Sequence, residues 1–184
     1  MLSCNAHHLK SYHLCTLVLI CFCCFDDLIG VVDGTLLALA GLKRLDMSSL
    51  VSESQCVPPS TLLPAVAQGA IGIQCRDNDP TMINYLNSLN HKDTKVCVDC
   101  ERAFLKALDG NCRTPIAGQA SITDGVLNFK GFLSKADGSE SVFVDRSGSP
   151  HTFESIGREA AQEIKDHLGP AKFKEYQMSF DEAI

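Results

Sequence analysis

Residues 121–144, SITDGVLNFKGFLSKADGSESVFV, alternate apolar and polar side chains in runs that two turn signals separate. The turn signals are the dipeptides Asp124-Gly125 and Asp137-Gly138. An Asp-Gly pair between alternating runs indicates a β-hairpin, because both residues tolerate the positive φ angles of a tight hairpin turn. The stretch therefore predicts an antiparallel meander of two or three strands.

Upstream of this stretch, two segments carry apolar side chains at helical spacing. Residues 79–91 begin with Asp79, a suitable N-cap, and with Pro80, which is favoured at the first helical position. Residues 93–108 repeat the helical spacing, and Gly110 ends their pattern. We therefore predict two helices before the meander.

Downstream of the meander, residues 153–168 form an amphipathic helical pattern that Gly169-Pro170 ends, and we expect a loose tail after it. A helix, three strands and a second helix are enough to enclose one core. We therefore predict a complete small α+β domain and assign residues 90–184 to it.

Two further apolar stretches precede the helices. Residues 35–45, TLLALAGLKRL, predict a buried strand that turns at Gly41. Residues 64–75, PAVAQGAIGIQC, predict a second strand, and the glycines within it suggest that another backbone or a ligand approaches closely. Residues 46–62 are rich in Ser, Pro and polar side chains, so we expect a connector between the two strands.

The amino-terminal segment contains a short apolar run, residues 14–25, LCTLVLICFCCF. The run is too short to span a bilayer, and Asp26-Asp27 stands where a secretory signal would have a small-residue cleavage site. A transit peptide would be rich in Ser and Arg, and residues 1–29 contain no Arg. We interpret residues 1–29 as an atypical, Cys-rich leader foreign to the domain behind it, from an alternative exon or a mispredicted start. A secretory or membrane-targeting signal remains the alternative.

Composition narrows the class of protein. The 184 residues, of which 45% are hydrophobic, suit one compact domain or slightly more. The net charge of −6 argues against nucleic acid as the main partner, because a phosphate backbone needs a basic surface. Five of the ten cysteines fall in the first 24 residues and the others are scattered, which is atypical of a secreted disulfide scaffold. We therefore expect a reduced, intracellular type of protein.

Two possible reaction centres carry little weight. Cys97 and Cys100 form a CxxC pair that suits a redox couple or half of a zinc site, but no second CxxC completes the site. Because both residues lie in the predicted helix, burial as small apolar side chains is the better interpretation. Ser60 and His91 could belong to a hydrolase, but the G-x-S-x-G motif is missing from the sequence. No metal is expected.

Cys112 is the stronger candidate. It lies in residues 108–118, LDGNCRTPIAG, in a predicted loop between Asp109-Gly110 and Arg113. A loop thiol is accessible, and a nearby positive charge stabilises its thiolate. From the residues alone, a functional thiol and a loop cysteine without a role both remain open.

Four motifs resemble a known family. They are residues 37–45 (LALAGLKRL), 63–76 (LPAVAQGAIGIQCR), 100–105 (CERAFL) and 108–120 (LDGNCRTPIAGQA). In this order and spacing they resemble hydroxymethylbilane synthase, also called porphobilinogen deaminase, over about residues 30–169. The resemblance covers only the carboxyl-terminal half of the family, and AVAQGAIG and CRTPIAG are most similar to the plastid enzymes of plants.

The resemblance implies a division into domains. Residues 30–63 would be a remnant of the family's second, α/β domain with a connector, and residues 64–89 a hinge strand and helix returning to the first domain. Residues 90–184 would be the C-terminal domain with the cofactor cysteine loop. The expected fold class is α+β / α/β: a C-terminal α+β domain with a three-stranded antiparallel sheet and helices, plus incomplete pieces of two periplasmic-binding-protein-like α/β domains.

The resemblance also implies a reaction and its site. The family, a group of transferases in porphyrin, heme and chlorophyll biosynthesis, condenses four porphobilinogen molecules with loss of ammonia into the linear tetrapyrrole hydroxymethylbilane. The residue matching Cys112 carries a dipyrromethane cofactor through a thioether, and a soft thiolate suits the electron-poor carbon that it binds. Gln68 and the backbone of Gly69 and Ala70 would hydrogen-bond in the cofactor cleft, and Arg76 would hold acidic side chains. The alternatives are a satisfied buried amide for Gln68 and a surface ion pair for Arg76.

The sequence also departs from the family. The family's catalytic aspartate and most of its substrate-pairing arginines fall in regions that nothing here matches. Only Arg76 and Arg113 are suitably placed among the six arginines of the chain. We therefore expect the chain to be incomplete for catalysis, with a non-catalytic truncated or splice-variant fragment that binds a tetrapyrrole or a partner protein as the alternative.

Partners and compartment follow from the resemblance alone. The expected ligands are porphobilinogen and its polypyrrole intermediates, and the chain is expected to be a monomer that does not associate with membranes. The family resemblance favours the chloroplast, although no transit peptide is visible, and the cytoplasm is the alternative.

Overall fold

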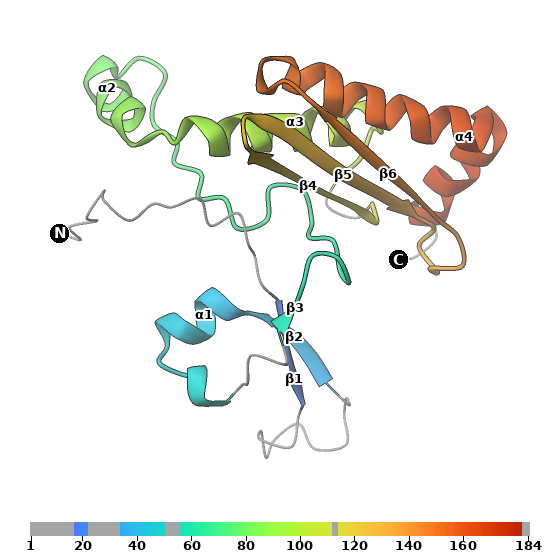
Figure 1. Ribbon diagram of the computed structural model, residues 1–184, viewed down its shortest axis with the longest axis horizontal. Coiled ribbons are helices and arrows are strands. Elements are labelled where there is room, and N and C mark those ends of the chain that lie inside the picture. Colours follow the sequence, from blue (N-terminus) through green and yellow to red (C-terminus); the bar gives the residue numbers. More distant parts are fainter. Residues whose placement is uncertain (1–16, 22–33, 51–55, 112–113, 182–184) are drawn as a thin grey trace. The chain divides into compact units, whose positions relative to one another are not determined.

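The computed structural model describes residues 17–21, 34–50, 56–111 and 114–181 (Figure 1). The chain divides into two compact units, the smaller Leu14–Pro64 and a larger unit that includes Ala65–Ile184. Among the described residues, no helix is both long enough and apolar enough to cross a membrane.

The larger unit contains the predicted meander and its flanking helices. The elements, in chain order, are α2 (Pro80–Leu89), α3 (Lys92–Ala107), β4 (Ile116–Thr123), β5 (Val126–Ser134), β6 (Ser141–Gly148), a 3-10 turn at Pro150–Thr152 and α4 (Phe153–Asp181). The strands form an antiparallel sheet in the order β4-β5-β6. The three-stranded α+β domain is therefore confirmed.

The hairpin turns form where the Asp-Gly pairs predict them. Asp124 and Gly125 have φ angles of 52° and 75°, so both residues adopt the left-handed conformation of a tight two-residue turn. β4 begins at Ile116, five residues before the predicted meander. The sequence IAGQA at residues 116–120 hides this start, because small Ala and Gly side chains weaken the apolar alternation.

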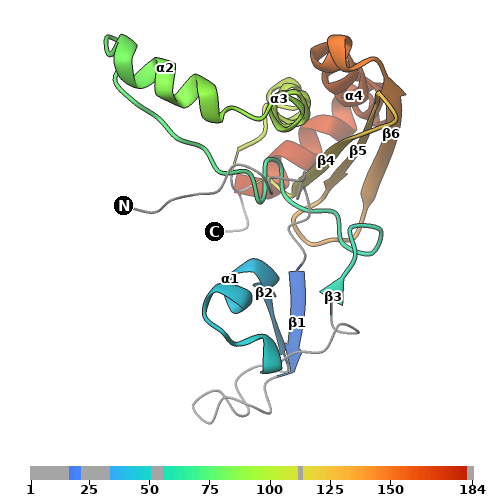
Figure 2. The same ribbon diagram turned by 60° about the vertical axis from the view of Figure 1, so that its left-hand side comes forward.

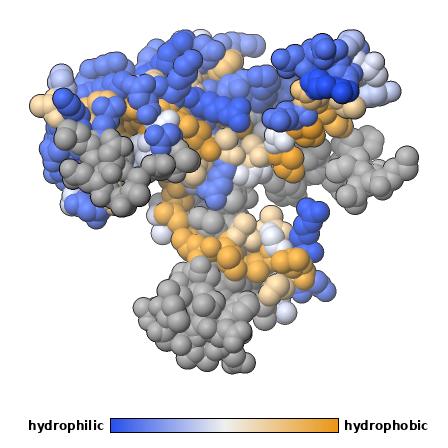
Figure 3. Space-filling model, turned by 180° about the vertical axis from the view of Figure 1, so that it is seen from behind, coloured by the Kyte–Doolittle hydropathy of each residue, from blue (hydrophilic) through white to orange (hydrophobic). Residues whose placement is uncertain are grey.

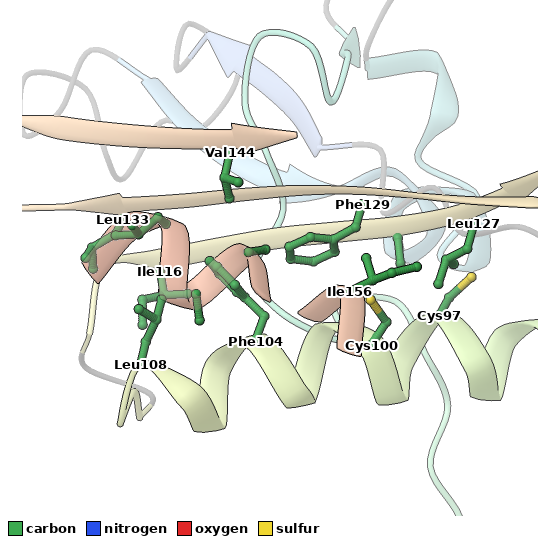
Figure 4. Packing of buried hydrophobic residues seen from close by; sticks show 14 of the residues in the cluster. Cys97, Cys100, Phe104, Leu108, Ile116, Leu127, Phe129, Leu133, Val144 and Ile156 are labelled. Carbon is green, nitrogen blue, oxygen red and sulfur yellow. The ribbon is translucent and has the colours of Figure 1, made fainter. Parts of the chain in front are cut away.

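One face of the sheet holds the core. α3 and α4 pack against each other and against the strands, on the same side of the sheet (Figure 2). Side chains of α3 point toward the strands (Figure 4), and the ring of Phe104 lies 5.0 Å from that of Phe129 on β5. Side chains along one side of the α4 helix, including Ile156 and Ile164, complete the cluster.

α3 and α4 touch backbone to backbone at Gly157. A Cβ atom at this position would lie 2.3 Å from the carbonyl oxygen of Cys100 and 3.0 Å from the backbone nitrogen of Phe104. Any side chain here would push the two helices apart. The glycine therefore sets how closely α4 covers α3.

The loose tail expected after Gly169-Pro170 is wrong. Gly169, with φ 71° and ψ 162°, interrupts α4, but the helix resumes and continues to Asp181. Pro170 suits the first turn of the resumed segment, since a first-turn residue needs no N–H donor. Tyr176 is only 1% exposed and joins the core cluster, and this burial explains why the segment is ordered.

Charged side chains fasten the resumed segment to the β5–β6 hairpin. Lys135 Nζ lies 2.7 Å from Glu175 and 3.3 Å from Glu140, and Lys172 Nζ lies 2.6 Å from Glu140. Hydrogen bonding to Lys172 and Lys135 lowers the pKa of Glu140. The tail is therefore held by both an aromatic side chain and an ion-pair network.

α2 forms as predicted but buries little. Asp79 Oδ1 accepts a hydrogen bond from the Met82 backbone N–H at 3.0 Å, as expected of an N-cap. The helix has no buried residue, and Tyr85 and Leu89 are 65% and 62% exposed. In Figure 3, hydrophobic surface lies beside hydrophilic surface where α2 is found, at the upper right.

The strand predicted over residues 64–75 is wrong. The chain instead forms consecutive turns over residues 66–69, with positive φ at Ala67 and Gly69, followed by irregular backbone. Ile71 and Ile73 are 91% and 61% exposed. A strand needs a ladder partner, and within the described residues none pairs with this segment.

The smaller unit contains a second antiparallel sheet, in the order β2-β1-β3. Its elements are β1 (Leu17–Cys21), β2 (Gly34–Ala38), α1 (Leu39–Arg44), a 3-10 turn at Ser48–Leu50 and β3 (Cys56–Val57). The strand predicted over residues 35–45 therefore ends at Ala38. Leu39 and Leu42, three residues apart, share a helix face, and Leu42 is buried against Leu39, Met47 and Cys56.

β1 lies inside the segment interpreted as a leader, residues 1–29. It pairs with both β2 and β3, so these five residues form the central strand of the sheet. Residues 17–21 thus pair within the smaller unit, and the interpretation of residues 1–29 as a foreign leader stays a prediction. The remainder of residues 1–29 lies outside the described residues.

Candidate functional site

Cys112 and Arg113 lie outside the described residues, but the structure describes both sides of their loop. On the upstream side, α3 ends in a Schellman motif: the N–H of Gly110 donates to Leu105 at 3.0 Å, and that of Asp109 donates to Lys106 at 3.1 Å. Asp109 occupies the left-handed position of this motif, with φ 54°. Asp109 therefore forms the turn that the sequence favours for it.

Hydrogen bonds close the loop around Cys112. The Asn111 N–H donates to Thr114 Oγ1 at 3.0 Å, and the Thr114 N–H donates to the Asn111 carbonyl at 3.2 Å. The carbonyl of Pro115 then accepts the Ser134 N–H of β5 at 3.1 Å. The ends of the loop are thus held by α3 on one side and by the sheet on the other.

The residues predicted to contact a cofactor backbone lie together in one turn, residues 65–70. The Gln68 N–H donates to the Ala65 carbonyl at 3.0 Å, and the Ala70 N–H donates to the Ala67 carbonyl at 3.1 Å. The Oε1 atom of Gln68 accepts the Ala65 N–H at 2.9 Å in an exposed hydrogen bond, whereas the alternative for Gln68 was a satisfied buried amide. Gly69 and Ala70 are exposed.

Arg76 follows this turn at the end of the irregular segment. Its Nη2 atom lies 3.2 Å from Asp79 Oδ2, and its side chain is 82% exposed. This geometry matches the surface ion pair that the sequence leaves open as the alternative. An exposed pair of this kind contributes little stability and is easily exchanged for another carboxylate.

Glu101 is a further residue of this region, and no sequence motif points to its role. It lies on α3, is only 4% exposed, and accepts two backbone hydrogen bonds: from the Ala67 N–H at 2.7 Å and from the Ala120 N–H at 2.8 Å. Burial raises its pKa, an effect larger than the opposing ones of these donors and of Arg102. The signal for it was a Glu at helical spacing from Cys97 and Phe104, on the buried face of α3.

The CxxC pair is buried on the same helix. Cys97 and Cys100 are 3% and 0% exposed, and both are free thiols. Burial, together with the charge of Glu101, raises the pKa of each to about 12. These thiols therefore stay protonated near neutral pH, and the interpretation as small apolar core residues is confirmed.

Two hollows of the larger unit lie elsewhere, along β6 and α4. One of about 290 Å³ is lined by Phe143, Glu163 and His167 among others, and one of about 450 Å³ lies along Arg146, Glu159 and Asp166. None of these residues was predicted as a site residue. No group of three or more potential metal ligands gathers among the described residues.

Two family models match the chain. "Porphobilinogen deaminase, dipyromethane cofactor binding domain" matches residues 25–84, and "Porphobilinogen deaminase, C-terminal domain" matches residues 95–166. Together they cover more than two thirds of the chain. The chain belongs to the porphobilinogen deaminase family. The resemblance carried by the sequence motifs is confirmed, and the chain contains a match to the family's cofactor-binding domain.

Porphobilinogen deaminases of plants and bacteria are similar to the chain. The chloroplastic enzyme of Oryza sativa subsp. japonica is 51% identical over 152 residues, which are 80% of this chain and 42% of that protein. The chloroplastic enzyme of Pisum sativum is 51% identical over 148 residues, 78% of this chain and 39% of that protein. The enzyme of Nitrosomonas europaea is 42% identical over 138 residues, 75% of this chain and 44% of that protein. The chain spans about two fifths of the length of these relatives.

The two porphobilinogen deaminase models separate at residues 85–94, beyond the boundary between the compact units at Pro64 and Ala65. The C-terminal model begins within α3 and ends within α4, so it contains the complete sheet β4-β5-β6 and the Cys112 loop. The cofactor-binding model begins before β2 and ends within α2, so it contains the turn with Gln68.

Proposed function

We propose that the chain provides the thiol-bearing part of porphobilinogen deaminase, the synthase of hydroxymethylbilane. In that reaction four porphobilinogen molecules condense with loss of ammonia, and Cys112 holds the dipyrromethane cofactor as a thioether. The observation that carries the proposal is the order of the two family matches together with the position of the CRTP motif, in a loop between α3 and β4.

The chemistry of the CxxC pair favours Cys112 over Cys97 and Cys100 as the anchor. Thioether formation needs an accessible thiol that ionises, and the raised pKa values of Cys97 and Cys100 make these two poor nucleophiles. Cys112 follows the end of α3 in a loop that hydrogen bonds hold on both sides. When bound, the dipyrromethane supplies the primer to which pyrrole units are added.

The turn of residues 65–70 and Arg76 supply the non-covalent contacts of this proposal. Gly69 has no side chain and Ala70 has a small one, so the exposed backbone beside Gln68 is open to a ligand. The exposed guanidinium of Arg76 can exchange Asp79 for a ligand carboxylate and bind it through two N–H donors. The residues present therefore fit a carboxylated pyrrole ligand.

The proposed division into domains follows the family. Residues 30–63 belong to the second domain and its connector, and residues 64–89 form the hinge and helix that return to the first domain. Both would be pieces of periplasmic-binding-protein-like α/β domains. Residues 90–184 are the C-terminal domain. The boundary between the two compact units, at Pro64 and Ala65, supports the start of the hinge segment.

A non-catalytic role is the second candidate, and the arginines favour it. A growing chain of pyrroles carries two carboxylates per unit and needs many cationic partners. Arg146 instead pairs with Glu159 and Glu163, and Arg158 pairs with Glu154. The chain alone would then bind a tetrapyrrole or a partner protein without completing the reaction.

One experiment tests both candidates. The purified chain is incubated with porphobilinogen or preformed hydroxymethylbilane, its intact mass is measured, and product formation is assayed. We expect an added mass of two pyrrole units that Cys112→Ala abolishes and the control Cys75→Ala retains. Turnover would assign the full reaction to this chain, and an adduct without turnover would assign the binding role. Absence of any adduct would overturn the proposal for Cys112.

The chloroplast is the proposed compartment, because the rice and pea relatives are chloroplastic enzymes. A tagged chain expressed in plant cells should fractionate with intact plastids as soluble protein. Recovery in the cytosol would contradict this compartment, and recovery of the uncleaved chain in membranes would favour a targeting role for residues 1–29. The proposed monomer is checked by light scattering of the same preparation.

A further inference from the structure

Glu101 joins three segments that are distant in sequence. Its carboxylate belongs to α3, one oxygen accepts the Ala67 N–H of the turn, and the other accepts the Ala120 N–H of β4. Ala67 and Ala120 are 53 residues apart, and β4 is the strand that follows the Cys112 loop. A single side chain thus bridges the turn that contains Gln68 and the strand next to the anchor loop.

This bridge requires a carboxylate. Two separate oxygens of one buried side chain accept two separate N–H groups. A glutamine offers one oxygen, so one N–H would face an NH₂ group, which is itself a donor. An N–H left without an acceptor in a buried site carries its full desolvation penalty.

An apolar contact at Val66 also anchors the turn. Val66 packs against the core, and its Cγ2 atom would lie 3.5 Å from a Cβ built at Gly118 on β4. Beyond the turn, residues 69–74 are exposed, and α2 has no buried residue. An apolar contact at Val66 fixes distance better than orientation, so the two directional hydrogen bonds of Glu101 decide how the turn is presented.

We propose that Glu101 is a positioning residue, which orients the turn of residues 65–70 on β4 and so presents Gln68, Gly69 and Ala70 to the carboxylated pyrrole ligand of the function proposed above. The orientation of the turn is a property of the folded chain alone. Its consequence for the cofactor rests on the function proposed above. The two parts can therefore be tested separately.

The first test measures the turn without any ligand. In the full chain, Glu101→Gln is compared with Asp99→Asn, a control on the same helix whose carboxylate pairs only with Lys95 at the surface. Amide hydrogen exchange in residues 65–70 should accelerate roughly 10- to 100-fold in Glu101→Gln, while β5 and β6 stay protected. The Ala67 and Ala120 amide signals in NMR spectra should also shift together as Glu101 is titrated. Unchanged exchange, or equal acceleration throughout the domain, would overturn the orienting role.

The second test measures the ligand step. The rate at which the Cys112 adduct forms should fall about 10-fold or more in Glu101→Gln and stay unchanged in Asp99→Asn. If the wild-type chain forms no adduct, the proposed function fails, while the exchange test still decides the orientation of the turn. If the adduct forms at the wild-type rate in a Glu101→Gln chain whose turn has loosened, the coupling to the cofactor is wrong.

Discussion

α2 and α3 are adjacent in the chain and both are amphipathic, yet only α3 has a face of buried side chains. α3 contributes Cys97, Cys100 and Phe104 to the core, whereas α2 has no buried residue and leaves Tyr85 and Leu89 largely exposed. Each helix is also capped by the side chain of the residue before it, Asp79 for α2 and His91 for α3. The difference teaches that a periodic pattern specifies a helix, while burial depends on whether a matching sheet face lies within reach.

The largest expected effect is a loss of stability that distinguishes a substitution on α3 from one on α2. Phe104→Ala should destabilise the larger unit by about 3–5 kcal/mol, because the cavity lies between α3 and Phe129 and cannot collapse. Tyr85→Ala on α2 should change the stability by less than about 0.5 kcal/mol. Urea unfolding followed by far-UV circular dichroism measures both. Equal effects would show that α2 also has a packed partner.

The close contact of α3 with α4 gives the next largest effect. Gly157→Ala should cost about 1–3 kcal/mol, since its Cβ would overlap the Cys100 carbonyl oxygen and force the helices apart. Gly72→Ala is the matched control, because no atom lies within 4 Å of a Cβ at that position. The same unfolding experiment applies, and a neutral Gly157→Ala would contradict the backbone contact.

The N-cap of α2 tests whether this helix depends on local interactions. Asp79→Ala should destabilise α2 by about 1 kcal/mol, because the Met82 N–H loses its acceptor. Hydrogen exchange should therefore accelerate over residues 80–89 and stay unchanged in α3. Asp77→Ala provides an exposed control on the same segment. A loss of protection that spreads into α3 would mean that the two helices form one cooperative element.

Glu101 gives the stability of the larger unit a dependence on pH through α3. Its pKa is higher in the folded chain than its ordinary value of 4.5, so the folded state binds the proton more tightly. The stability that Glu101 contributes should therefore rise as the pH falls from neutral toward 4.5 and stay constant below that pH. The difference in unfolding free energy between wild type and Glu101→Gln, measured across this range, checks the sign. A wild-type value that falls relative to Glu101→Gln on acidification would contradict the raised pKa of this buried carboxyl.

The smallest expected effect concerns the two buried thiols of α3, which should not react with an alkylating reagent. Because the pKa values of Cys97 and Cys100 are about 12, iodoacetamide at pH 8 should leave both unmodified in the folded chain. Cys75, which is only half-buried, should be alkylated first. Peptide mass mapping locates the labels, and urea should make all three cysteines reactive. Labelling of Cys100 before Cys75 would contradict the packing of α3.

The sequence predicts the local elements of the larger unit well because their signals are local. Asp-Gly pairs mark hairpins, Asp79-Pro80 marks a helix start, and apolar periodicity marks the buried face of α3. The strand predicted over residues 64–75 fails because a strand depends on a partner that its own residues do not specify. The ordering of residues 170–181 escapes prediction for the same reason, since it depends on Tyr176 meeting a distant hairpin.

The residues of the candidate site likewise divide into those that a local sequence motif identifies and those that depend on distant partners. Gln68, Gly69 and Ala70 were found through their motif, and the structure places them in one turn. Glu101 was missed because its partners are two backbone N–H groups far away in sequence, and no pattern of side chains reveals them. The roles of Cys112 and Arg76 toward a ligand stay predictions.

The burial of Tyr176 has a consequence for how the chain is made. Tyr176, near the carboxyl end of α4, packs in the same core as Val96, which lies 80 positions earlier in the chain. A nascent chain can begin to pair β4, β5 and β6 as they leave the ribosome, but its core stays open until Tyr176 has emerged. Until that point, Lys135 and Glu140 of the hairpin also lack their ion-pair partners on the resumed segment of α4. The unit is therefore most accessible to chaperones and proteases before the end of α4 has been synthesised.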